Sequence, residues 1–67
     1  MENYNKTIAD AIRAIETLAN IIMDNPSVEE YVRETYPNFN AEIQDSLNDG
    51  DYKYAALLAI QDEMFNG

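Results

Sequence analysis

The sequence predicts an all-α fold, a compact single-domain bundle of about four helices. Three observations support this prediction. Apolar side chains recur every three or four residues along most of the chain, as they do on the buried face of a helix. Pro26, Pro37 and Gly50 stand between the periodic stretches, where helices should end. With 67 residues and no linker or internal repeat, we expect one domain spanning residues 1–67.

The chain is organised around a long helix predicted over residues 6–24. Its main apolar stripe follows the i, i+3, i+4, i+7 pattern and comprises Ile8, Ala11, Ile12, Ile15, Leu18, Ala19 and Ile22. Four further residues, Ala9, Ala14, Ile21 and Met23, widen the apolar arc to roughly 200°. We therefore expect other helices to cover this one on more than one side. Asn5 or Thr7 is expected to cap its start, and Pro26 should end it near Asp24.

Two short helices are predicted next. Ser27 and Glu30 stand three residues apart and predict a capping box at the start of the second helix. Pro37 should end that helix near residue 36. Asn38 or Asn40 is then expected to cap a third helix over residues 41–48.

Gly50 suits the left-handed position after the third helix, and Asp51 is expected to cap a fourth helix over residues 52–65. The apolar arc expected on this helix comprises Tyr54, Leu57, Leu58, Ile60, Met64 and Phe65, with Asp62 and Glu63 on the opposite, polar side.

The turn before the fourth helix shows one local resemblance. Gly50, Asp51 and Tyr52, together with Ala55, resemble the G-D-Y-x-x-A turn that joins the two helices of a tetratricopeptide repeat. The resemblance implies a helical hairpin at this point and no particular function. The pattern occurs once, Ile43 stands where the repeat has a small residue, and a repeat solenoid needs at least about three repeats.

The composition argues against most kinds of catalysis. The chain has no cysteine and no histidine, so we expect no disulfide, no zinc site and no catalytic thiolate or imidazole. The carboxylate pairs Asp49/Asp51 and Asp62/Glu63 are expected to be solvated rather than catalytic. No glycine-rich phosphate-binding motif is present. We therefore expect a protein that is not an enzyme, with no cofactor and no metal.

A calcium loop starting at Asp45 would place Gly50 at the sixth position, as EF-hand loops do. The third and twelfth positions would then be Leu47 and Ala56, which cannot bind a cation. Helix capping accounts for the same acidic residues.

The strongest compositional signal is the net charge of −9, from 13 acidic and four basic side chains. Such a chain is repelled by nucleic-acid phosphates and by anionic membranes, so we expect neither as a direct partner. A hydrophobic content of 46% argues against disorder. No long uncharged apolar run and no signal-peptide pattern are present. We expect a cytoplasmic protein, in the host cytoplasm if the chain is phage-encoded.

The acidic side chains are expected to form the functional surface. Several stand three or four residues apart, which places like charges on one side of a helix at a cost in stability. Such rows can copy the charge spacing of a nucleic-acid backbone. We therefore predict a protein–protein interaction module that docks on the basic surface of a partner, most concretely as an inhibitor or mimic of nucleic acid facing a nucleic-acid-binding protein. Small acidic phage proteins that block restriction or CRISPR systems act in this way, and the likeness is one of size and charge. The expected acidic face comprises Glu29, Glu30, Glu34, Glu42, Asp45, Asp49, Asp51, Asp62 and Glu63.

Two alternatives stay open. The acidic charge could serve solubility alone. The protein could instead be a structural or assembly protein, in which the apolar arc of helix 6–24 forms a homodimer or docks in a partner's groove. Tyrosines near the helix ends either fill gaps in a small core or act as interface anchors, and the candidates for anchors are Tyr31, Tyr36 and Tyr52.

Overall fold

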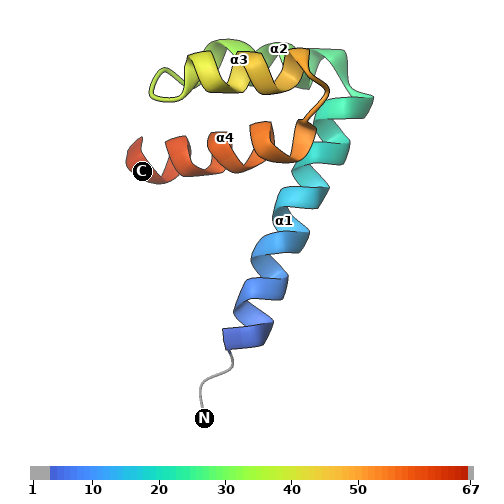
Figure 1. Ribbon diagram of the computed structural model, residues 1–67, viewed down its shortest axis with the longest axis vertical. Coiled ribbons are helices and arrows are strands. Elements are labelled where there is room, and N and C mark those ends of the chain that lie inside the picture. Colours follow the sequence, from blue (N-terminus) through green and yellow to red (C-terminus); the bar gives the residue numbers. More distant parts are fainter. Residues whose placement is uncertain (1–3, 67) are drawn as a thin grey trace.

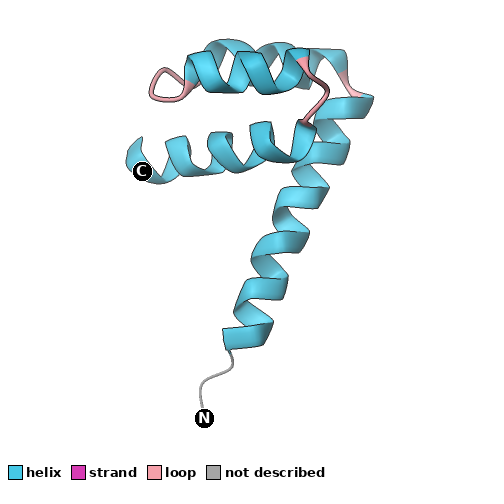
Figure 2. Ribbon diagram, viewed as in Figure 1, coloured by secondary structure: helices cyan, strands magenta, loops and turns pink. Residues whose placement is uncertain are grey.

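The computed structural model describes residues 4–66, and four helices account for nearly all of them (Figures 1 and 2). The helices are α1 (Tyr4–Asp24), α2 (Pro26–Thr35), α3 (Asn40–Asn48) and α4 (Tyr52–Asn66). No strand occurs in the described part of the chain. The predicted all-α fold with one long helix and three shorter ones is therefore confirmed.

The four helices are arranged like the numeral seven (Figure 1). The helices α2, α3 and α4 run back and forth as two successive hairpins, with α4 beneath α3. The end of α1 meets this group near one side, while its N-terminal half projects away from it. The molecule measures 41 × 25 × 18 Å along its principal axes, and the projecting half of α1 accounts for its elongation.

The core lies among the three short helices and the C-terminal half of α1. Its buried apolar residues are Ala19, Ile22, Val32, Tyr36, Ile43, Leu47, Ala55, Ala56, Leu58 and Ala59. Three of the four members from α4 are alanines, and such small side chains allow close packing of helix backbones. The core is therefore thin, as expected for a chain of this length.

The apolar arc predicted for α4 is largely wrong. Tyr54, Met64 and Phe65 are 47%, 76% and 74% exposed, and only Leu58 of the predicted arc is buried. The buried face instead follows Ala55, Leu58, Ala59 and Asp62, again at helical spacing. Apart from Leu58, the large apolar side chains of α4 lie outside this face, so side-chain size was a misleading guide to the buried direction.

The hairpin of α3 and α4 is formed as expected. Gly50 has φ +79°, the left-handed conformation that favours glycine. The N–H of Gly50 donates to the carbonyl of Leu47 at 3.1 Å, and that of Asp51 donates to the carbonyl of Ser46 at 2.8 Å. This pair of bonds is the Schellman ending of α3. The side chain of Asp51 then accepts the N–H of Tyr54 at 3.2 Å and caps α4, as predicted.

Other predicted caps are not formed. The capping box of Ser27 and Glu30 is absent because α2 begins two residues earlier than a cap at Ser27 would place it, at Pro26, with Asn25 as its N-cap. No side chain caps α3, whose N-cap position is Phe39.

The start of α1 also differs from the prediction. Asn5 and Thr7 lie inside α1, which begins at Tyr4, so neither occupies the expected cap position.

The expectation that α1 is covered on more than one side is also wrong. Every side chain from residue 4 to residue 14 is exposed, including Ile8 and Ile12 at 57% and 51%. The covering helices meet only the second half of α1, because they form a hairpin group shorter than α1 itself.

Candidate functional site

An uncovered apolar stripe runs along the projecting half of α1. It comprises Tyr4, Ile8, Ala11 and Ile12, all exposed, and we call it the α1 stripe. At 100° per residue, these four and the core-facing residues Ile15, Leu18, Ala19 and Ile22 fall within one arc of about 120°. The same face of one helix is therefore buried at its C-terminal end and bare at its N-terminal end.

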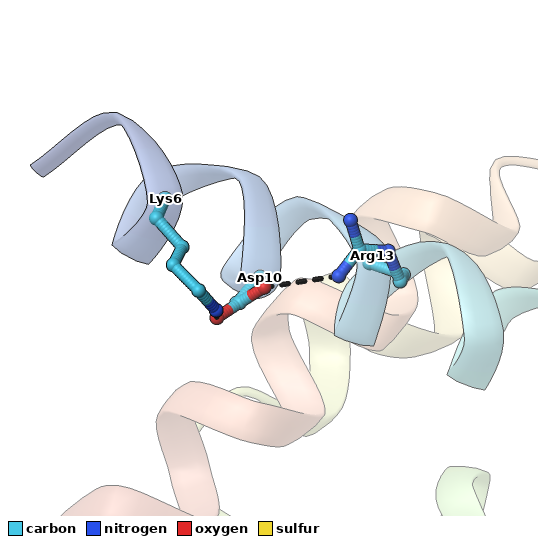
Figure 3. A network of polar contacts seen from close by, with 3 residues as sticks. All are labelled: Lys6, Asp10 and Arg13. Atoms are coloured by element: carbon cyan, nitrogen blue, oxygen red, sulfur yellow. Dashed lines mark hydrogen bonds and ion pairs between the residues drawn. The ribbon is translucent and has the colours of Figure 1, made fainter. Parts of the chain in front are cut away.

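The face of α1 opposite the stripe is charged. Lys6 and Arg13 both bind the carboxylate of Asp10, at 3.3 and 2.9 Å (Figure 3). All three side chains are at least half exposed, so these ion pairs add little stability. They do make this segment amphipathic, with charged side chains on one side and the apolar stripe on the other. Counting Glu16 as well, residues 4–16 have a net charge of zero.

The predicted acidic face is not a single surface, and Asp62 does not belong to any surface. The side chain of Asp62 is fully buried. Its carboxylate accepts the backbone N–H groups of Asn38 and Phe39, at 3.0 and 3.4 Å, and the side-chain amide of Asn38 at 2.8 Å. Asp62 therefore holds the α2–α3 turn against α4, and its expected place on a polar face is wrong.

Two further acidic residues are engaged within the fold. Glu63 accepts a hydrogen bond from the hydroxyl of Tyr36 at 2.9 Å. Glu29 forms an ion pair with Arg33 at 2.9 Å, and Arg33 also reaches Gln44 on α3 at 3.3 Å. The Tyr36–Glu63 and Arg33–Gln44 hydrogen bonds connect α2 to α4 and α3, and the Glu29–Arg33 ion pair within α2 reduces the charge available to a partner.

Four of the predicted acidic residues do converge. Glu42, Asp45, Asp49 and Asp51 line one shallow hollow, together with Ser46 and Tyr54. We call these four carboxylates the acidic hollow. Glu30 and Glu34 are exposed on α2 and do not line it.

The three predicted aromatic anchors have different environments. Tyr31 is 57% exposed, Tyr36 is buried and Tyr52 is partly buried against the core. The rings of Tyr31 and Tyr36 meet edge to face with centroids 6.3 Å apart. Burial and the hydrogen bond to Glu63 raise the pKa of Tyr36 to about 12. Only Tyr31 is therefore exposed enough to act as an anchor.

No family model, curated protein or solved structure matches the chain.

Residues 4–66 contain neither a candidate membrane span nor a candidate metal site. None of the described helices has the length and apolar character needed to cross a membrane. Within the same residues, no three acidic side chains are grouped so that they could hold a metal ion.

The α1 stripe is the feature that the sequence interpretation placed wrongly, since Ile8 and Ile12 were expected in the core. The sequence carried a signal for an apolar face, because six residues of α1 alternate in steps of four and three: Tyr4, Ile8, Ala11, Ile15, Leu18 and Ile22. The sequence did not indicate which half of that face the other helices cover.

Proposed function

We propose that the protein is a non-enzymatic interaction module that binds an amphipathic helix along the α1 stripe. The observation that carries the proposal is the unbroken apolar face of α1, which is buried at one end and exposed at the other. A core stripe that continues for several turns into solvent is typical of a helix whose partner is missing.

The energetics favour a partner. Tyr4, Ile8 and Ile12 are 68%, 57% and 51% exposed, and fully burying one side chain of this size stabilises by about 1.5–3 kcal/mol. The projecting segment also lacks the tertiary packing that normally stabilises a helix, and isolated helices of this length are marginal in water. A partner would therefore gain apolar burial and would fix this half of α1.

The spacing of the stripe indicates that the partner is itself a helix. Steps of four and three residues are the heptad pattern of helices that pack along one another. The flanking residues Asn5, Thr7 and Ala14 are uncharged. No charge would therefore have to be buried at the edges of a helix–helix contact.

The test is a pull-down of tagged protein from lysate of the source cells, comparing the native chain with Ile8→Asp. A charge in the middle of the stripe should abolish capture of the partner. Ala9→Asp is the matched control, because it adds the same charge beside the stripe and should leave capture unchanged. Equal capture by all three chains would disprove docking through the stripe.

A second candidate function rests on the acidic hollow. Two carboxylates of α3 and two of the turn between α3 and α4 lie beside the exposed ring of Tyr54. They provide a compact acidic surface for a basic protein, such as a nucleic-acid-binding protein inhibited by a phage-encoded mimic. Binding there should weaken steeply with salt.

Charge reversal separates the two candidates. The triple variant Glu42→Lys, Asp45→Lys and Asp49→Lys should abolish binding of a basic partner, whereas Ile8→Asp should not. Asp51 is left unchanged because it caps α4. Either function fits the cytoplasm as the proposed location, since a chain without cysteine needs no oxidising compartment.

A further inference from the structure

We infer that the helix bound by the α1 stripe is the α1 stripe of a second copy of this chain, in antiparallel orientation. The inference rests on the proposed function and names its partner. Three features of the described residues support it: the distribution of charge, a second apolar face on α4, and the length of the projecting segment.

The charge is distributed so that two copies can meet only at the projecting segment without strong repulsion. Residues 17–66, which we call the acidic body, carry ten acidic and two basic side chains, a net charge of −8. Residues 4–16 carry two acidic and two basic side chains, a net charge of zero. Contact between acidic bodies would be opposed by like charge, whereas contact between stripes meets no net charge.

The second apolar face lies on α4 and adjoins the stripe. Leu57, Ile60 and Met64 fall within about 60° of one another on α4. Leu57 and Ile60 are partly exposed, and Met64 is 76% exposed. Lys53, on the same face of α4, hydrogen-bonds Glu16 of α1 at 3.5 Å. This contact places the apolar face of α4 beside the point where α1 leaves the core, and the two helices diverge from there (Figure 1).

The α1 stripe is too short to form a stable dimer alone, so the dimer contact also has to include the apolar face of α4. Residues 4–15 span about 18 Å of helix, fewer than two heptads, which is short for a stable two-stranded coil on its own. A second copy therefore has to contact α4 as well as α1. Antiparallel pairing provides this contact, because the N-terminal end of each stripe then reaches the start of the α4 face, beside Lys53, in the other copy.

Antiparallel pairing also determines which residues of the two stripes lie opposite each other. Ile8 lies opposite Ala11 of the second copy, and Tyr4 lies opposite Ile15 of the second copy. The two acidic bodies then stand at opposite ends of the paired helices, as far apart as the chain permits. The contact is isologous and closes as a dimer, so it leaves no stripe free for further association.

The first test is sedimentation equilibrium of the purified native chain from about 1 to 200 µM at physiological salt. We expect a dimer of twice the 7.7 kDa chain mass. Ile8→Asp should raise the dimer dissociation constant at least about 100-fold. Ala9→Asp should change it by less than about threefold. Both sites are exposed in a single copy of the chain, so circular dichroism should show an unchanged fold.

Orientation is tested by cross-linking, because the chain contains no cysteine of its own. A mixture of Tyr4→Cys and Ile15→Cys chains should form a disulfide between the two variants on oxidation. Tyr4→Cys chains alone should not cross-link, since antiparallel pairing separates these two positions by about 16 Å along the helix. Efficient self-linking of Tyr4→Cys would overturn the antiparallel arrangement.

The outcomes distinguish this inference from the function on which it rests. A native chain that stays monomeric at 200 µM, while Ile8→Asp still abolishes capture of another protein, overturns the second copy as partner and leaves helix docking intact. A monomer whose pull-down is also insensitive to Ile8→Asp overturns both. A dimer that dissociates in Ile8→Asp and survives in Ala9→Asp supports both.

Discussion

At the scale of single residues, stability depends on one buried carboxylate. Asp62 is fully buried and accepts hydrogen bonds from two backbone N–H groups and one side-chain amide of the α2–α3 turn. Replacing it by alanine leaves these donors unpaired in the interior. We expect Asp62→Ala to lower the free energy of unfolding by about 3 kcal/mol or more. A chain of this size has about 3–10 kcal/mol in total, so the variant should lose roughly a third of its stability or more.

Urea denaturation followed by circular dichroism measures this loss. Glu34→Ala, which removes an exposed carboxylate of α2, is the control and should change stability by less than about 0.5 kcal/mol. An Asp62→Ala chain as stable as this control would show that the buried carboxylate is dispensable.

Tyr36 predicts a loss of stability in alkaline solution. Its pKa is raised to about 12 by burial, with the hydrogen bond to Glu63 as a further cause, whereas an unfolded tyrosine titrates near 10. Between about pH 10 and 12 the unfolded chain releases this proton and the folded chain keeps it, so stability falls as pH rises through this window.

Ultraviolet absorbance should show one tyrosine ionising later than the others. Tyr36→Phe should remove this late phase and the corresponding part of the alkaline destabilisation. A late phase that persists in Tyr36→Phe would assign it to another ring.

At the scale of elements, the junction of α3 and α4 depends on the conformation of one residue. Gly50 has φ +79°, and a methyl group added there would touch nothing within 4 Å. The cost of Gly50→Ala is therefore conformational, and we expect a loss of about 1 kcal/mol in the free energy of unfolding. Thermal unfolding by circular dichroism measures it, and Gly50→Asn should lose less, because asparagine tolerates the left-handed region better than alanine.

The elements were also the part of the fold that could be predicted from the sequence. Pro26, Pro37 and Gly50 act on the backbone beside them, so helix ends were placed within two residues. Contacts between distant residues could not be inferred in this way. The turn that Asp62 binds begins 24 residues before it, and nothing in the local spacing distinguishes this carboxylate from the exposed Glu63 next to it.

The candidate site was harder to predict for a related reason. The apolar period of α1 is the same in its covered and uncovered halves, so periodicity alone cannot locate the boundary between them. That boundary is set by how far the α2–α3–α4 group extends along α1, which is a property of the assembled molecule.

At the scale of the whole molecule, the inferred dimer makes unfolding depend on concentration. The melting temperature of the native chain should rise with protein concentration, because association stabilises only the folded state. The melting temperature of Ile8→Asp should be independent of concentration and equal to that of the dilute native chain. Differential scanning fluorimetry over a hundredfold range of concentration checks this, and a flat response of the native chain would contradict association.

The division of α1 into a covered and a projecting half has a consequence for how the protein can evolve. Side chains from residue 4 to residue 14 are exposed and contribute nothing to the buried core. If the α1 stripe is the docking surface that we propose, substitutions there change what the chain binds at little cost in core packing, whereas substitutions at Ile22 or Ile43 are constrained by packing. Selection for a new partner could therefore act on a single helical face while the remainder of the chain stays under separate, purely structural constraint.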